Sequence, residues 1–327
     1  ITRQVLRYNP SKVILLDQAE SALYDLNVEL INAGIQGNWE VVIADVSNEE
    51  RMKHVFEHFK PHVIFHAAAY KHVPLMEDNP SEAILTNVKG TKNVADLANK
   101  YNVERFVMIS TDKAVNPTNV MGASKRIAEM YVQALNANST TNYITTRFGN
   151  VLGSNGSVIP LFKKQIEKGG PITVTDERIT RFFMTIPEAC QLVLEAGSMG
   201  KGGEIFVFDM GESIRIMDLA KKMIQLSGLE LGKDIEIKIT GLRPGEKLYE
   251  ELLTDQEKTI ATHHEKIMIG VTQEYTLEEI APKIDDLIAS FETQNNLTIV
   301  GKMKHLVPEF RSNNSEFSVL DKDEHIE

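Results

Sequence analysis

Short apolar runs alternate with amphipathic stretches through the first half of the chain. The runs are rich in β-branched residues and predict strands near 13–16, 41–43, 63–65, 106–109 and 143–146. Between them the apolar spacing predicts helices, one of which covers about residues 80–100. Strands that are apolar throughout are buried on both faces. The pattern therefore predicts a parallel sheet covered by helices, a doubly wound α/β fold.

The pattern loosens after residue 150 and predicts a smaller second lobe. Glycine and proline separate short predicted strands near 172–174, 181–184, 204–208 and 235–239. We therefore expect a main α/β domain over 1–150 and a lobe over 151–311, some segments of which return to the main domain. The polar residues 312–327 are expected to form a loosely ordered tail.

Composition argues against several classes of protein. The chain has 35 basic and 46 acidic residues, a formal charge of 35 − 46 = −11, which disfavours non-specific binding to nucleic acid or an anionic membrane surface. The single cysteine, Cys190, cannot form an internal disulfide, which favours a reducing, cytoplasmic compartment. No apolar run approaches the roughly 18 residues that a membrane-spanning helix needs. No spacing of histidines and carboxylates suggests a metal site.

A dinucleotide-binding sheet should begin with a strand and a glycine-rich turn, and neither is found at the start of this chain. Ile1 begins what reads as a helix, so we expect the first strand and its turn to lie upstream of the numbered residues. Gly149, Gly153 and Gly156 follow a predicted strand, but their spacing does not match G-x-G-x-x-G. We interpret them as a flexible substrate loop.

Ligands of doubly wound sheets bind beyond the carboxyl ends of the strands, where two acidic residues are found. Asp17 follows the first predicted strand, where a carboxylate binds the ribose diol of adenosine and disfavours a 2′-phosphate. Asp45 and Val46 follow the second, where they would contact adenine. For both aspartates the alternative is a helix cap.

The next two predicted strands also end in residues suited to a ligand. Ala67, Ala68 and Ala69 would let a bulky ligand approach the backbone, although close helix packing would also explain them. The run Ser110–Lys113 places four polar side chains in succession after a buried strand.

Seven segments together carry a resemblance to a known family: His66–Glu77, Thr86–Thr91, Ser110–Pro117, Met121–Arg126, Arg147–Ser157, Thr180–Met184 and Gly241–Lys247. They resemble the bacterial nucleotide-sugar 4,6-dehydratases of polysaccharide biosynthesis, extended short-chain dehydrogenases/reductases that act on UDP-N-acetylglucosamine. The resemblance extends to about residue 310. It departs from the wider superfamily at Met121, which replaces the tyrosine of Tyr-x-x-x-Lys while Lys125 remains. In this respect the chain resembles the membrane-anchored branch, in which a transmembrane region precedes the catalytic domain.

The resemblance implies a Rossmann fold, a homo-oligomer and bound NAD, with NADP less favoured because of Asp17. Hydride would pass from C4 of the sugar to NAD, water would leave across C5 and C6, and hydride would return to C6 to give a UDP-4-keto-6-deoxy-sugar. Asp112 is expected to act as the acid at C6 and Lys113 as the base at C5, for which Lys113 must be partly neutral. Lys125 would bind the nicotinamide ribose. Thr111, Asp112 or a water molecule would take the C4 hydroxyl proton.

The substrate diphosphate calls for arginine side chains, which grip phosphate in a planar, bidentate geometry. Arg181 and Arg243 match family positions for this task, and Glu246 suits a ribose diol; a structural salt bridge is the alternative for each arginine. The remaining expected substrate contacts are Lys71, His72, Asn150, Ser154, Asn155 and Thr173. For His72, as for His66, a packing role is equally compatible with the sequence.

Two other functions compete with the dehydratase. A nucleotide-sugar 4-epimerase of the same fold would share the C4 oxidation but would not need Asp112 and Lys113 for elimination. A non-catalytic dinucleotide sensor would be expected to lose Lys125 and the two arginines, all of which are present.

Overall fold

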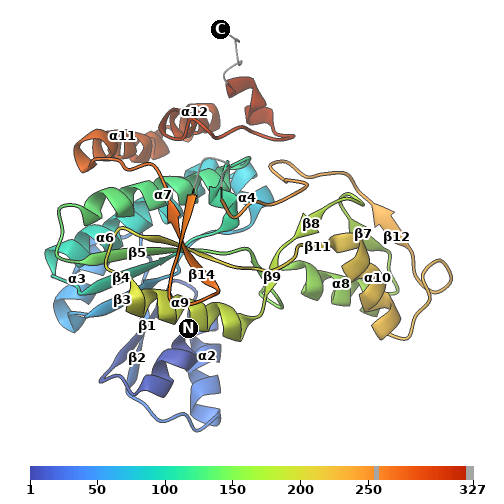
Figure 1. Cartoon of the computed structure of the whole chain (residues 1–327), viewed down its shortest axis with the longest axis horizontal. Helices are drawn as coiled ribbons and strands as arrows, with labels where there is room; N and C mark the ends of the chain where they lie inside the picture. The colour runs from blue at the N-terminus through green and yellow to red at the C-terminus, as the bar shows by residue number, and fades with distance from the viewer. Residues whose placement is uncertain (254–257, 322–327) are drawn as a thin grey trace.

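A mixed sheet forms the centre of the molecule in the computed structural model, which describes residues 1–253 and 258–321 (Figure 1). Its six strands lie in the order β13 (Lys258–Ala261), β14 (Ile267–Val271), β10 (Ile205–Phe208), β5 (Asn142–Arg147), β4 (Arg105–Ile109) and β3 (Val63–His66). The last four run parallel to one another, whereas β14 is antiparallel to both β10 and β13. The carboxyl ends of β3, β4 and β5 therefore meet at one edge of the sheet.

Two further strands, β1 (Val13–Asp17) and β2 (Trp39–Ile43), pair in parallel as a separate sheet. In the doubly wound order 3-2-1-4-5-6, β1 takes position 2 and β2 takes position 3, and β3, β4 and β5 take positions 4, 5 and 6. Within residues 1–253 and 258–321, no strand takes position 1 between β1 and β3. The predicted fold class is confirmed, but the single predicted sheet is divided in two. The upstream first strand stays a prediction.

Helices cover both faces of the main sheet because its strands alternate their apolar side chains. Phe106 and Met108 of β4 pack with one core cluster, and Val107 between them packs with another. The first cluster includes helices α3 (Glu49–Phe59), α6 (Gly90–Lys100), α7 (Val120–Asn136), α11 (Leu277–Ala289) and α12 (Asn296–Leu306). The second includes α9 (Ile186–Met199). Helices α11 and α12 pack against α7 (Figure 1). Helix α7 is buried along almost its whole length.

The remaining elements of this body are short, apart from one helix beside β1. They are α1 (Thr2–Val5), η1 (Leu6–Tyr8), α2 (Glu20–Asn32), α4 (Val73–Asp78), α5 (Pro80–Ala83), the π-helical η2 (Ile84–Lys89), η3 (Asp112–Ala114) and η4 (Ser290–Thr293). Elements α5, η2 and α6 follow one another directly and together form the long helix that the sequence predicts near 80–100.

The second lobe has its own small core and lies to the right in Figure 1. It contains α8 (Val158–Glu167), β7 (Ile172–Val174), α10 (Ile216–Leu226) and β12 (Ile237–Ile239). The strand predicted near 181–184 is two short strands, β8 (Thr180–Arg181) and β9 (Phe183–Met184), which pair with β11 (Ile214–Arg215) and β6 (Asn150–Val151) respectively. Strand β10 and helix α9 belong to the main body.

The predicted loose tail is wrong for residues 312–321. They pack against the main body and include η5 (Glu316–Leu320), in which Phe317 is only 1% exposed. Ser315 Oγ donates a hydrogen bond to Glu77 Oε2 at 2.5 Å. The segment is ordered because one aromatic side chain enters the core and the neighbouring polar side chains form hydrogen bonds. The mostly polar composition of the segment does not indicate these tertiary contacts. Residues 322–327 lie outside the described part of the chain.

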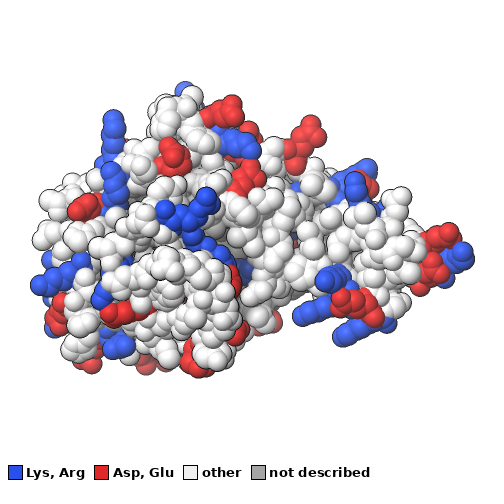
Figure 2. All heavy atoms as spheres, turned by 90° about the horizontal axis from the view of Figure 1, so that it is seen from below, with Lys and Arg blue, Asp and Glu red and all other residues white. Residues whose placement is uncertain are grey.

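The surface in Figure 2 carries acidic and basic side chains of both signs, interspersed with uncharged surface. Neither sign covers this face continuously. In the part of the chain that the structure describes, none of the helices combines the length and the apolar character needed to cross a membrane.

Candidate active site

The predicted acid/base pair lies at the carboxyl end of β4, where Asp112 is buried and Lys113 is half-buried. Lys113 Nζ donates a hydrogen bond to Asp112 Oδ1 at 2.9 Å, and Thr111 Oγ1 donates to the same oxygen at 2.9 Å. The backbone N–H of Asp112 donates to Phe148 O just beyond β5, which fixes the pair between the two strand ends. Asp112 is wholly buried, so the pair is not a surface salt bridge. Its Oδ2 atom is buried without a hydrogen-bond partner among the described residues, which leaves an acceptor for a ligand.

Lys113 lies among several oxygen atoms besides those of Asp112. Its Nζ is 3.5 Å from Glu250 Oε1 and donates to Asn150 Oδ1 at 3.4 Å. Burial lowers the pKa of Lys113, but the carboxylates of Asp112 and Glu250 outweigh that effect and the pKa is raised overall. The expectation of a partly neutral Lys113 therefore does not hold in this structure, in which the two anions stabilise its charged form.

Glu250 is a site residue that the sequence reasoning missed. Its side chain is buried, Oε1 is 3.6 Å from Arg181 Nε, and Oε2 has no hydrogen-bond partner among the described residues. Glu250 thus bridges the acid/base pair and a predicted diphosphate ligand. The available signal was its place four residues after Glu246, in a run that already supplies two expected substrate contacts.

The predicted diphosphate residues meet beside this pair. Arg181 Nη2 is 3.5 Å from Glu246 Oε1, and Arg243 Nη2 is 3.3 Å from the same oxygen. A cavity of about 60 Å³ is lined by Lys113, Arg181, Arg243, Glu246, Glu250 and the residues around them. The arginines are therefore in salt bridges, as the alternative interpretation allowed, but these salt bridges lie at a cavity that also reaches Lys113.

The other expected substrate residues do not line this cavity. Thr173, on β7, accepts a hydrogen bond from Gln165 Nε2 at 2.8 Å. Ser154 and Asn155 belong to the glycine-containing loop, and Lys71 and His72 precede α4 with exposed side chains. The His72 ring lies against Gly156 of that loop. Burial lowers the pKa of His72, with smaller contributions from Lys71 and Arg243.

Met121 and Lys125 lie one turn apart on α7 and are both buried. Burial lowers the pKa of Lys125 to about 8, although Glu129 acts in the opposite direction. The start of α7 rests directly on the acid/base pair: a Cβ atom on Gly122 would lie 2.0 Å from Lys113 O. Such close contact fixes Lys125 relative to Asp112 and Lys113.

The ends of β1, β2 and β3 carry the residues expected to bind the dinucleotide. Asp17 is exposed, and its Oδ1 accepts from the N–H of Ala19, while α2 starts later without a side-chain cap. Asp45 accepts from the N–H of Ser47, whereas Asn48 caps α3. Neither aspartate is therefore the helix cap.

The small side chains at the end of β3 leave their backbone accessible. Ala67 is exposed and Ala68 and Ala69 are half-buried, whereas Ser110 at the end of β4 is buried. An accessible carboxylate and an accessible stretch of small residues at neighbouring strand ends fit the adenosine part of NAD. His66 beside them is a packing residue: it is hydrogen-bonded to Thr91 Oγ1 at 2.8 Å, and burial lowers its pKa to about 3.

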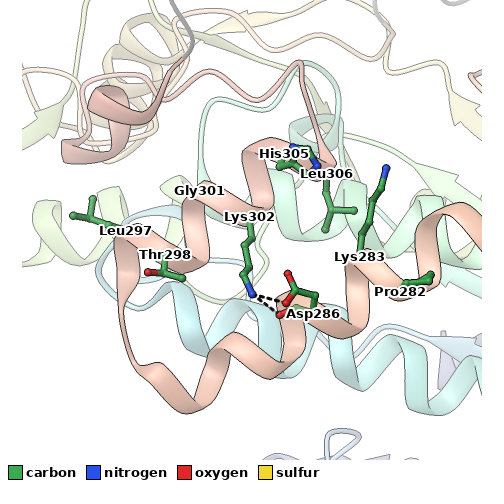
Figure 3. A pocket seen from close by; sticks show the side chains of 9 residues that line it. All are labelled: Pro282, Lys283, Asp286, Leu297, Thr298, Gly301, Lys302, His305 and Leu306. Carbon is green, nitrogen blue, oxygen red and sulfur yellow. Dashed lines mark hydrogen bonds and ion pairs between the residues drawn. The ribbon is translucent and has the colours of Figure 1, made fainter.

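A larger cavity, of about 470 Å³, lies between α11 and α12 (Figure 3). Lys302 of α12 reaches Asp286 of α11 across it, with Nζ 2.8 Å from Oδ1. None of the predicted site residues lines this cavity. The strand ends, and not the larger cavity, are therefore the candidate active site.

Comparison with known proteins places this site in a family. The family model described as polysaccharide biosynthesis protein matches residues 1–272. Capsular polysaccharide biosynthesis protein CapD of Staphylococcus aureus is 54% identical over 304 residues, which are 92% of this chain and 51% of that protein. UDP-N-acetylglucosamine 4,6-dehydratase (inverting) of Campylobacter jejuni is 36% identical over 262 residues, 79% of this chain and 74% of that protein.

A solved structure is also similar to this chain in sequence and in fold. Pen from Bacillus thuringiensis has a TM-score of 0.76 and 36% identity to this chain, with 84% of this chain and 83% of that chain covered. The chain spans about half the length of CapD. All the candidate site residues lie inside the matched range 1–272. The chain therefore belongs to the polysaccharide biosynthesis protein family, with a Rossmann fold of the short-chain dehydrogenase/reductase type.

Proposed function

We propose that the protein is a nucleotide-sugar 4,6-dehydratase that converts UDP-N-acetylglucosamine to a UDP-4-keto-6-deoxy-sugar. The observation that carries the proposal is the hydrogen-bonded pair of buried Asp112 and half-buried Lys113, with Asp112 Oδ2 unpartnered among the described residues, next to a cavity lined by Arg181 and Arg243. An epimerase needs no such pair, because it removes no water. The C. jejuni relative, named a UDP-N-acetylglucosamine 4,6-dehydratase, supports the same reaction.

NAD, when bound, would supply a reversible hydride acceptor beside the sugar. Asp17 would hold the adenosine ribose and disfavour the extra phosphate of NADP. Ala67, Ala68 and Ala69 would let the dinucleotide approach the backbone, with Asp45, Val46 and Ser110 beside it. Lys125 would bind the nicotinamide ribose. Burial holds its pKa at about 8, below the ordinary lysine value.

The elimination can use the single proton in the Asp112–Lys113 hydrogen bond. When substrate excludes water, transfer of this proton from Nζ to the carboxylate exchanges a buried ion pair for a neutral amine and a carboxylic acid. Lys113 then takes the C5 proton, and Asp112 protonates the C6 oxygen, which leaves as water. The pair ends the elimination in its starting charge state, so a raised resting pKa of Lys113 is compatible with its role as the base. Thr111, Asp112 or a water molecule would take the C4 hydroxyl proton, which balances the proton that C5 regains when hydride returns to C6.

When substrate binds, Arg181 and Arg243 would break their salt bridges with Glu246 and bind the diphosphate instead, because guanidinium groups bind phosphate in a bidentate geometry. Glu246, released from the arginines, would be available to the uridine ribose. Asn150, Ser154, Asn155, Thr173, Lys71 and His72 would contact the rest of the nucleotide-sugar. Membrane attachment and a homo-oligomeric state remain predictions from the family resemblance.

Turnover in deuterated water tests this proposal. The protein with NAD and UDP-N-acetylglucosamine should give a 4-keto-6-deoxy product with deuterium at C5, as detected by NMR. Asp112→Asn should reduce turnover by about 100-fold or more, since a positioned acid or base contributes 10²–10⁴-fold. A product with inverted C4 and an intact C6 hydroxyl group would indicate the epimerase, and wild-type turnover by Asp112→Asn would remove the pair from the mechanism.

A further inference from the structure

The segment after α12 lies outside the range 1–272 that the family model matches, yet it reaches the candidate active site. We call residues 311–315 the C-terminal strap. On one side the strap is bonded to the loop before α7: the N–H of Arg311 donates to Pro117 O at 3.1 Å, and the N–H of Asn313 donates to Thr118 O at 3.1 Å. The strap therefore starts from a fixed position beside the first turn of α7.

On its other side the strap binds the loop that carries Arg243 and Glu246. Asn313 O accepts from the N–H of Gly245 at 2.7 Å, and Asn313 Nδ2 donates to Glu246 O at 2.7 Å. Asn314 Nδ2 donates to Leu242 O at 2.7 Å. The strap thus holds the loop just before Arg243 and again just after it.

Contacts beyond the loop prevent the strap from moving freely. Ser315 donates to Glu77 Oε2 at 2.5 Å, and Glu77 Oε1 accepts from the N–H of Val120, the first residue of α7, at 2.7 Å. Phe317 enters the main core, and Lys304 Nζ of α12 is 2.5 Å from Asp321 Oδ1. The strap is therefore attached to the same helix that carries Met121 and Lys125.

Arg243 needs such support because its own side chain is 57% exposed. An arginine on a surface loop grips phosphate well only when the loop holds its backbone in the productive geometry, since ordering a free loop on binding reduces affinity. Within the described residues, Thr118 and Asn119 add two further bonds to Gly245 O. Together with the strap, they fix the loop to the main body.

We propose that Asn313 and Asn314 are positioning residues of the diphosphate site, through which the C-terminal strap orders the loop 242–246 for substrate binding. This inference rests on the proposed function, in which Arg243 and Glu246 bind UDP. It gives a role in substrate binding to a segment outside the matched family range.

The affinity for UDP, measured by calorimetry, tests the inference without turnover. Asn313→Ala removes one side-chain bond to the loop. Asn314→Gly removes the other and keeps the backbone favourable, because Asn314 has a φ of 49° that glycine adopts easily. The double variant should weaken UDP binding about 30-fold, since two hydrogen bonds of about 1 kcal/mol each are lost and about 1.4 kcal/mol is tenfold. KM for the UDP-sugar should rise similarly, with kcat within about twofold of wild type because neither residue approaches the reacting atoms.

Val319→Ala is the matched control, because Val319 is 76% exposed in η5 and lies in the same C-terminal segment without touching the loop. Unchanged UDP affinity in both Asn313→Ala and Asn314→Gly would overturn the inference, provided that Arg243→Ala weakens UDP binding. If Arg243→Ala also binds UDP as wild type does, the proposed substrate site fails instead. A fall in kcat as large as the rise in KM would indicate that the strap has a general structural role, and it would also overturn the inference. The single Asn314→Gly variant keeps the test valid if the double variant does not fold.

Discussion

The protonation of Lys113 depends on carboxylates from two distant parts of the chain. Burial would lower its pKa, and Asp112 and Glu250 raise it, so the ammonium form is stabilised through neutral pH. The proposed proton transfer begins from that form. Activity should therefore fall as the pH rises through the pKa of Lys113, and any change that lowers this pKa should move the fall to lower pH.

Glu250→Gln removes one of the two anions next to Lys113. The alkaline limb of kcat/KM should move to lower pH by about 1 unit or more, because a nearby opposite charge shifts a pKa by about 1–3 units. The pH profile of each variant with the UDP-sugar measures this shift. Glu251→Gln is the matched control, since its side chain is 49% exposed and pairs with Lys247 instead. Equal alkaline limbs in the two variants would contradict the role assigned to Glu250.

Individual site residues could be predicted from the sequence where they follow a predicted strand or belong to a known motif. Asp112 and Lys113 follow an apolar strand, and Arg181 and Arg243 fall in recognisable motifs, and the structure brings all four together. Glu250 follows no strand, and its approach to Lys113 depends on the path of a loop from the other half of the chain. The raised pKa of Lys113 is due first to its neighbour Asp112 and then to Glu250, and only the first of these carboxylates could be placed beside it from the sequence.

At the scale of elements, the start of α7 packs closely against η3 because Gly122 has no side chain. The helix begins with Asn119 as its cap, which accepts from the N–H of Gly122 at 2.7 Å. A Cβ atom on Gly122 would lie 2.0 Å from Lys113 O and 3.2 Å from Asn119 Oδ1. The carbonyl group belongs to the backbone, so it cannot rotate away, and the helix itself would have to move.

Gly122→Ala should therefore separate α7 from η3 and displace Lys125 from the acid/base pair. We expect a destabilisation of about 1–3 kcal/mol from overpacking, despite a helix-propensity gain of about 1 kcal/mol, together with a large loss of kcat. Denaturant unfolding and steady-state kinetics measure the two effects. Gly301→Ala in α12 is the matched control, because its added Cβ meets nothing within 4 Å, and it should stabilise the protein with kcat unchanged. A fully active Gly122→Ala enzyme would show that this contact does not position the site.

Helices and strands could be predicted from the sequence where their local pattern of apolar residues identifies them. Strands β3, β4 and β5 are short runs rich in apolar or β-branched residues, and they lie where the sequence predicts them. The short strands β8 and β9 depend on pairing with β11 and β6, which local periodicity does not reveal. The same limit explains the error over residues 312–321, whose order comes from tertiary contacts of a mostly polar segment.

At the scale of the whole molecule, the two lobes have separate apolar cores. The second lobe buries its own cluster: Phe162, Ile172, Val174, Ile179, Ile216, Ala220, Ile224 and Ile235. The main body buries a different cluster around α7. Ion pairs join the lobes at the candidate active site, where Glu250 reaches both Lys113 of the main body and Arg181 of the second lobe. The proposed substrate would therefore bind across two units that are stabilised independently.

Phe162→Ala tests this independence, because Phe162 is 1% exposed in the core of the second lobe. Loss of a buried phenylalanine ring costs about 3–5 kcal/mol, and we expect faster amide hydrogen exchange over 158–174 and 216–239, with weaker UDP binding. Met52→Ala on α3 is the counterpart in the main body, since Met52 is 3% exposed. It should speed exchange in α3 and α6 and leave the second lobe and UDP affinity unchanged. If Phe162→Ala instead raised exchange equally throughout both lobes, the molecule would unfold as one unit, and the substrate would not join two independent ones.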